Sequence, residues 1–154
     1  MPRTYNSYRR RAPARARRPS ERVIRGAHTT MPATQQAQAY VWTATDPCTV
    51  GNIRLDIGID GSIGVDPIPY ALVYVPEGYN INNLTYPAVT DDMYNPTKSV
   101  LISGVLNNAG GDDHKFSRIG RKCSIGDRIA LILLNTSASS PQSVGFELSF
   151  TTLH

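Results

Sequence analysis

The sequence predicts an all-β fold, a sandwich or jelly roll of antiparallel strands, with a basic arm at its N-terminus. Two observations lead to this prediction. From about residue 36 onward, short apolar runs alternate with Gly, Pro, Asn and Asp, which is typical of strands separated by turns. Before that point the chain is rich in arginine and proline, and it has almost no apolar residues as far as Val23.

The arm comes first along the chain and spans residues 1–36. It cannot bury enough apolar surface to fold alone, so we expect it to be disordered. Residues 1–25 hold nine arginines against the single acid Glu21, a net charge of +8, whereas residues 26–154 hold seven basic and eleven acidic residues, a net charge of −4. The overall charge of +4 is therefore the sum of a basic arm and an acidic body, and the arm predicts a polyanion as partner.

The body, residues 37–154, is long enough for one domain with a hydrophobic core. An eighth strand is expected at the arm boundary or in a loop, in addition to seven apolar runs. Those runs span residues 39–44, 50–59, 70–75, 100–106, 115–119, 128–134 and 144–151. Long links between some of the runs favour a sandwich or jelly roll.

The pattern within the runs predicts which strands face water. In residues 50–59, Ile53 and Leu55 point one way while Arg54 and Asp56 point the other, as in a strand with one wet face. Residues 144–151 repeat this alternation. Residues 129–134 are apolar throughout, which indicates a strand covered on both faces or buried inside an assembly.

Arginine without lysine suits the arm to nucleic acid, because guanidinium groups bind phosphate through paired hydrogen bonds and stay charged at every relevant pH. Tyr5 and Tyr8 offer rings on which bases can stack. The predicted nucleic-acid-binding residues of the arm are Arg3, Arg9, Arg10, Arg11, Arg15, Arg17, Arg18, Arg22 and Arg25. A second basic group that could line the same surface consists of Lys115, Arg118, Arg121 and Lys122, with Arg128 close by.

Other interpretations of these charges remain open. A short arginine cluster such as Arg9-Arg10-Arg11 is also sufficient for a nuclear-import signal, and import can share residues with nucleic-acid binding. The arm could instead only make the protein more soluble. For the second basic group, the competing interpretation is a set of turn charges on a solvated rim.

Catalytic and metal-binding patterns are lacking in the sequence. Neither G-x-S-x-G nor H-E-x-x-H occurs, and turn chemistry accounts for Asp112, Asp113 and His114. Cys48 and Cys123 have no zinc-ligand spacing, and we expect both to be reduced and buried. We therefore expect no enzymatic activity, no metal and no cofactor. The longest apolar run of the body, residues 129–134, is too short to cross a bilayer, so no membrane partner is expected.

Three segments carry a resemblance to a known family. They are residues 70–78 (YALVYVPEG), 93–101 (MYNPTKSVL) and 124–131 (SIGDRIAL). In this order they resemble a strand and its turn, the lead into the next strand, and a later turn and strand of capsid proteins from small circular single-stranded DNA viruses, the circovirus-like group that encodes a replication initiator. With the closing strand and the arginine-rich N-terminus, the resemblance covers most of residues 40–153.

The resemblance implies an eight-stranded jelly roll that self-assembles into a small icosahedral T=1 shell of about 60 subunits. It implies an arm on the inside that packages single-stranded circular DNA and serves as a nuclear localisation signal. The partners would then be other copies of the chain, single-stranded DNA and the host import machinery. The protein would be located in the virion, and in the host nucleus during assembly.

Two alternatives stay open beside this one. The capsid protein of a small RNA satellite virus would share the jelly roll and the arm but package RNA. A monomeric β-rich nucleic-acid-binding protein would have the arm without self-assembly.

Overall fold

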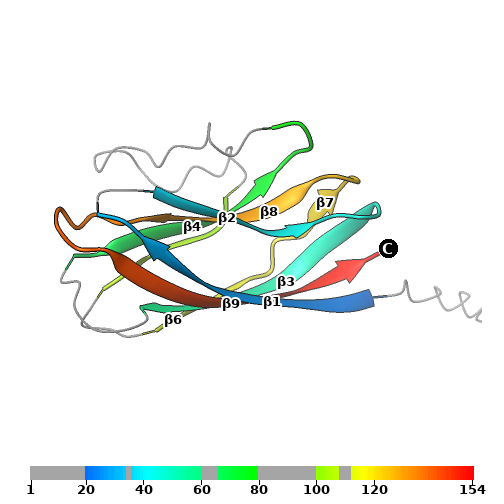
Figure 1. Ribbon diagram of the computed structural model, residues 1–154. Coiled ribbons are helices and arrows are strands. Elements are labelled where there is room, and N and C mark those ends of the chain that lie inside the picture. Colours follow the sequence, from blue (N-terminus) through cyan, green and yellow to red (C-terminus); the bar gives the residue numbers. More distant parts are fainter. Residues whose placement is uncertain (1–19, 34–35, 60–65, 80–99, 108–111) are drawn as a thin grey trace, which may run out of the picture.

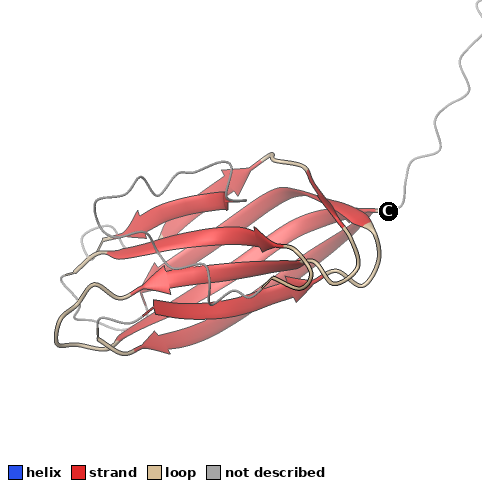
Figure 2. Ribbon diagram, turned by 90° about the horizontal axis from the view of Figure 1, so that it is seen from above, coloured by secondary structure: helices blue, strands red, loops and turns tan. Residues whose placement is uncertain are grey.

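The computed structural model describes residues 20–33, 36–59, 66–79, 100–107 and 112–154, which form two β-sheets packed face to face (Figure 1). Figure 2 shows the strands of both layers from above, and these described residues contain no helix. The all-β prediction is therefore confirmed. The strands are β1 (Ser20–Met31), β2 (Gln36–Thr43), β3 (Cys48–Ile59), β4 (Ile68–Val75), β5 (Val100–Leu106), β6 (Asp113–Ser117), β7 (Arg121–Cys123), β8 (Arg128–Leu134) and β9 (Gln142–Leu153).

The strand pairings are those of a jelly roll. β1 pairs with β9, β2 with β8, and β4 with β5, all antiparallel, while β3 pairs with both β6 and β7. The chain is thus one long hairpin rolled into two sheets, with strand orders β1-β9-β3-β6 and β2-β8-β4-β5. Because β6 and β7 pair with successive parts of β3, they share one strand position. The predicted eight-stranded jelly roll is the observed arrangement, with one of its strands broken in two.

β1 corrects the predicted boundary between arm and body. The arm was expected to extend to residue 36, but Ser20–Met31 form a strand that pairs with β9 along its whole length, from Ser20 opposite Leu153 to Met31 opposite Gln142. An edge strand needs few apolar side chains, and in β1 only Val23 and Met31 are buried. This is the eighth strand that the sequence placed at the arm boundary or in a loop. Residues 1–19 lie outside the described residues.

The core lies between the two sheets and follows the predicted alternation. Ile53, Leu55 and Ile57 of β3 point inward and are almost completely buried. The rings of Trp42 on β2 and Phe150 on β9 join the two layers edge to face, with centroids 5.2 Å apart. Each fully buried apolar side chain of this kind stabilises the fold by about 1.5–3 kcal/mol.

β8 is buried on both faces, as its continuous apolar run predicted. Ile129, Leu131 and Leu133 belong to the core between the sheets. Ala130 and Ile132 point the other way and belong to a second buried cluster on the outer face of β4 and β8. The outer face of β4 and β8 therefore contains a buried apolar cluster.

A buried carboxylate fixes the turn between β7 and β8. Asp127 is 4% exposed and accepts hydrogen bonds from the Tyr74 hydroxyl (2.6 Å) and from the backbone N–H groups of Ser124 (2.6 Å) and Glu77 (3.0 Å). Burial raises the pKa of Asp127, but these hydrogen bonds more than offset burial, so its pKa lies below the usual value. For Tyr74, burial and the bond to Asp127 raise the pKa to about 12. The network ties the end of β4 to the start of β8.

The two cysteines are free and buried, as predicted, and they face each other in the register of β3 and β7. Burial raises the pKa of Cys123 to about 11 and also raises that of Cys48. Among the residues that the structure describes, no group of three or more His, Cys, Asp or Glu is placed to hold a metal ion. The same residues include no helix with the length and apolar character that a bilayer span requires.

Candidate nucleic-acid interface

The outer face of the sheet β1-β9-β3-β6 carries the basic residues of the body that lie nearest to the arm. In the strand register, Phe116 on β6 is opposite Arg54 on β3, Arg54 is opposite Ser149 on β9, and Ser149 is opposite Ile24 on β1. Side chains of directly paired residues point to the same face of a sheet. These four residues therefore form one row across the outer face.

A neighbouring row, nearer the start of β1, supplies a second arginine. Arg22 on β1 is opposite Thr151 on β9, which in turn is opposite Gly51 on β3. Between the two rows lies a groove of about 310 Å³. Arg22 lines the groove on one side and Arg54 on the other, since β9 runs between their strands. Its remaining lining residues are Asn52, Phe116, Ser149, Phe150 and Thr151.

A bulge in β3 sets the position of Arg54 in this groove. The register between β3 and β9 shifts between Gly51 and Arg54, and Asn52 within the shift has a φ of 50°. Asparagine is one of the few non-glycine residues that adopt this left-handed conformation readily. A bulge redirects the side chains that follow it, and here Arg54 comes to lie beside Phe116.

Phe116 is an exposed ring within cation–π distance of two guanidinium groups. Its side chain is 51% exposed, although it lies in the middle of a strand. The guanidinium carbon of Arg54 is 5.6 Å from the ring centroid, and that of Arg118 is 5.9 Å from it. Within the described part of the chain, no carboxylate forms an ion pair with Arg22, Arg54 or Arg118. The positive charge of the groove is therefore not neutralised by these described residues.

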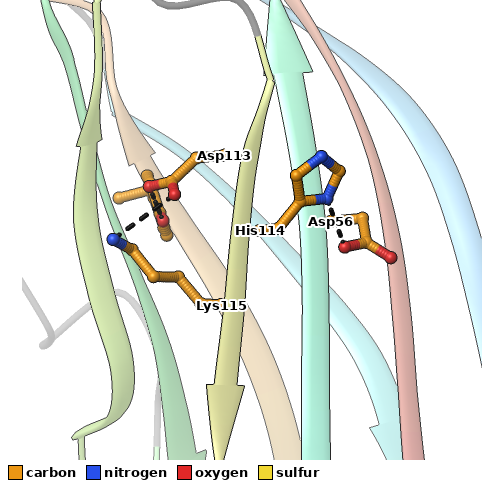
Figure 3. A network of polar contacts seen from close by, with 5 residues as sticks. Asp56, Asp113, His114 and Lys115 are labelled. Carbon is orange, nitrogen blue, oxygen red and sulfur yellow. Dashed lines mark hydrogen bonds and ion pairs between the residues drawn. The ribbon is translucent and has the colours of Figure 1, made fainter.

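The next row along the same face is acidic and contains histidine. His114 on β6 is opposite Asp56 on β3, and its Nδ1 lies 2.7 Å from Asp56 Oδ1 (Figure 3). The hydrogen bond to Asp56 and the negative charge of Asp56 raise the pKa of His114. Glu147 on β9 extends this row, because it is opposite Asp56. Along the strands, the face thus changes from basic at the start of β1 to acidic at its middle.

The structure separates the body residues that the sequence grouped together. Arg22 lines the groove, and the guanidinium of Arg118 lies near the ring of Phe116. Arg25 is opposite Leu148, a core residue, so it points to the other side of β1 from Arg22. The Arg25 guanidinium donates a hydrogen bond to the Ile24 carbonyl. Arg22 and Arg25 therefore do not act on one surface.

The second basic group is divided in the same way. Lys115 pairs with Asp113 at 3.3 Å on the opposite side of β6 from His114 (Figure 3). The Arg121 guanidinium lies 4.1 Å from the Tyr74 ring centroid, beside the Asp127 network. Lys122 on β7 is exposed. The group as a whole does not line one surface, because alternate residues of a strand point to opposite faces, and Lys115 and Arg121 are opposite the core residues Leu55 and Val50. Tyr5, Tyr8 and the arginines from Arg3 to Arg18 lie outside the described residues.

Two residues of the groove were not predicted as binding residues, namely Arg54 and Phe116. The alternation of residues 50–59 had already assigned Arg54 to the wet face. Phe116 lay in a run predicted as a strand, but an isolated phenylalanine there is more simply interpreted as core. Only the register of β3 with β6 brings the two together.

No protein-family model and no curated protein matches this sequence. The solved structures that are similar to it in fold include the following three. A chain from the acidic stable capsid structure of Helicobacter pylori bacteriophage KHP30 is 12% identical with a TM-score of 0.44, over 85% of this chain and 92% of that chain. A chain from Bacillus endospore appendages, a family of disulfide-linked pili, is 13% identical with a TM-score of 0.38, over 94% of this chain and 97% of that chain.

The third is a chain from infectious bursal disease virus strain Gt, 11% identical with a TM-score of 0.44, over 100% of this chain and 36% of that chain. At these identities and TM-scores, the similarities carry no argument about function. The functional conclusion rests on the residues of this chain.

Proposed function

We propose that this protein is a viral capsid protein whose body assembles with copies of itself into a closed shell and whose arm binds packaged single-stranded nucleic acid. The observation that carries the proposal is the junction of residues 1–19, which hold seven arginines and no acid, to the first strand of a jelly roll. Jelly rolls occur in viral capsids, in lectins and in cupins, so the fold alone does not select a function. The phosphate-binding chemistry of the arm favours the capsid.

The segments that resemble the capsid family support the proposal. Residues 70–78 fall on β4 and the turn after it, and residues 124–131 fall on the turn before β8 and on β8 itself. These are the positions that the resemblance implied. Most of residues 93–101 lie outside the described residues.

The finer form of the proposal is an icosahedral T=1 shell around single-stranded circular DNA. Identical subunits close a shell by repeating the same contacts around symmetry axes. The arm of each subunit then lies on the inside, where its arginines neutralise phosphates. The cluster Arg9-Arg10-Arg11 also suits the arm to nuclear import before assembly.

Assembly of the purified full chain tests the proposal. We expect closed, uniform shells by electron microscopy and a single large species by analytical ultracentrifugation, in the presence of single-stranded DNA. A monomer under all salt and pH conditions, binding DNA one to one, would overturn the shell and favour a monomeric nucleic-acid-binding protein. If ribonuclease degrades the co-purified nucleic acid and deoxyribonuclease does not, the packaged nucleic acid is RNA and not DNA.

The role of the arm is tested by its charge. In the full chain, replacing Arg3, Arg9, Arg10, Arg11, Arg15, Arg17 and Arg18 by glutamine removes seven positive charges from residues 1–19. Each phosphate contact contributes about 0.7 to the slope of log affinity against log salt for single strands, so we expect the slope to fall by up to about 5. The matched control replaces the same residues by lysine, which keeps the charge and should keep most of the slope. Equal slopes in the glutamine variant and the wild type would contradict the proposal.

A further inference from the structure

We propose that the groove between Arg22 and Arg54 is a second nucleic-acid site, which holds a phosphate of a single strand between the two arginines and the adjoining base against Phe116. The inference rests on the proposed function and extends it from the arm to the folded body. It assigns a binding role to Arg54 and Phe116, whose nearness becomes visible only in the strand register.

The two arginines are spaced to converge on one phosphate. They belong to β1 and β3, on either side of β9, and neighbouring strands lie about 4.8 Å apart, so the two strands are about 10 Å apart. Along the strand direction, Arg22 is also offset from the row of Arg54 by two residues, about 7 Å. Long arginine side chains on both sides can lean over the central strand. Below them, β9 contributes Ser149 and Thr151, which are small enough to leave the groove open and carry hydroxyls that can donate to a phosphate oxygen.

The exposed ring makes a nucleotide a better ligand than a simple anion. A half-exposed phenylalanine beside guanidinium groups offers a base an apolar ring and planar cations on which to stack. Stacking is tolerant of sequence, which suits a site that must accept any part of a packaged strand. Phe116 adds nothing to the core from this position, since it lies on the outer face.

The position of the groove in the chain joins it to the arm. Arg18 is four residues before Arg22, so at most about 14 Å of extended chain separates them. The acidic row of Asp56 and Glu147 lies on the other side of the groove and repels phosphate. A bound strand is therefore directed from the groove toward the start of β1, where the arm leaves the sheet.

Photochemical cross-linking with the full chain tests this site. The probe is a single-stranded oligonucleotide containing 5-iodouracil, and the cross-linked peptides are mapped by mass spectrometry. We expect a cross-link at Phe116 in the wild type. In the variant Arg22→Gln with Arg54→Gln, that cross-link should be lost and the salt slope of binding should fall by about 1.4, from two phosphate contacts.

Matched controls separate the groove from general charge and from exposed aromatic surface. Arg25→Gln removes one positive charge from β1, as Arg22→Gln does, but from the other face of the strand, and it should keep the Phe116 cross-link. Phe116→Leu should lower affinity at least about 5-fold, since stacking on one aromatic side chain has at least this effect. Tyr79→Leu, at an exposed aromatic residue in the turn after β4, should leave affinity unchanged. Thermal melting of each variant verifies that the fold is intact.

Two results would overturn the site. One is a wild-type cross-link map confined to the arm at saturating oligonucleotide. The other is an equal loss of binding in Arg25→Gln and in the Arg22 and Arg54 double variant. Failure of the proposed function would be seen in different experiments. The full chain would not assemble, or the arginine substitutions in the arm would not change binding, while the Phe116 cross-link would still form.

Discussion

The two sheets of the jelly roll have outer faces of opposite character. On the sheet β2-β8-β4-β5, five outward residues of β4 and β8 form an apolar cluster, and each is at most 8% exposed. They are Ala71, Val73, Val75, Ala130 and Ile132. On the sheet β1-β9-β3-β6, the outward positions carry arginine, aspartate, glutamate, histidine and a half-exposed phenylalanine.

The difference shows which face is available for a ligand. Side chains on the apolar face stabilise the fold, so replacing them costs stability. Side chains on the charged face of β3 contribute little to the core, so their chemistry is free to serve binding. The contrast was already present in the sequence, as a continuous apolar run in β8 and an alternating run in β3.

The largest expected effect comes from placing a charge on the apolar face. Ile132→Asp buries a carboxylate in the apolar cluster with Ala71 and Val73, whose described side chains offer it no hydrogen bond. An unpaired buried charge is strongly unfavourable, and we expect a loss of more than about 3 kcal/mol in the free energy of unfolding. Urea unfolding measures this loss.

The same substitution on the charged face is the control for that prediction. Ile24 is 50% exposed and lies in the row of Arg54 and Ser149. Ile24→Asp keeps its carboxylate in water, near two arginines, so we expect a change within about 0.5 kcal/mol, as for most surface substitutions. Equal losses at Ile24 and Ile132 would show that the two faces do not differ in the way described.

A smaller effect is expected where a charge is buried but fully bonded. Asp127→Asn removes the charge that accepts hydrogen bonds from Tyr74, Ser124 and Glu77. Because hydrogen bonds to charged groups contribute about 1.5–3 kcal/mol, we expect a loss of about 2 kcal/mol at pH 7. The comparison variant is Asp56→Asn on the charged face, which should cost less than about 0.5 kcal/mol.

The pH dependence of Asp127 follows from the direction of its shift. Its pKa is lowered in the folded state, so its contribution is present above the unfolded value of about 4 and is lost as pH falls through the folded value. Urea unfolding across this range should therefore show a decline in the wild type that is reduced in Asp127→Asn. Parallel declines in both proteins would exclude Asp127 as the source.

Most of the fold could be predicted from the sequence, because a strand that contributes to the core either alternates apolar with polar residues or is apolar throughout. β1 was assigned to the arm because it shows neither pattern. It contains Glu21, Arg22, Arg25 and His28, so its composition resembles that of the arm before it. Its place in the sheet comes from backbone pairing with β9, which composition does not record.

The candidate site was predictable only in part. Charge alone identified Arg22 and Arg118, but charge does not tell which face a residue occupies once a strand forms. The face of Arg25 and Lys115 follows from the register, and so does the nearness of Arg54 to Phe116. Register depends on contacts between distant segments, and a single sequence does not reveal them.

The smallest predicted effect concerns the acidic row of the charged face, which contains His114, Asp56 and Glu147. The hydrogen bond to Asp56 and the charges of Asp56, Asp112 and Asp113 raise the pKa of His114, which is exposed. Its stabilising contribution is therefore fully present below the unfolded value of about 6.5 and is lost as pH rises through the higher folded value. An NMR titration of the His114 ring measures the shift directly, and Asp56→Asn should move the pKa back toward 6.5.

The control for this titration is Asp46→Asn, which removes an exposed acid outside the pair and should leave the His114 titration unchanged. Because solvent screens an exposed pair, the change in unfolding free energy across the same pH range should be much smaller than that caused by Asp127 at acid pH. If the unfolding free energy changed as much with the titration of His114 as with that of Asp127, the exposed carboxylate of Asp56 would contribute as much stability as the buried carboxylate of Asp127. This result would also remove the physical basis for treating the charged face as free to bind a ligand.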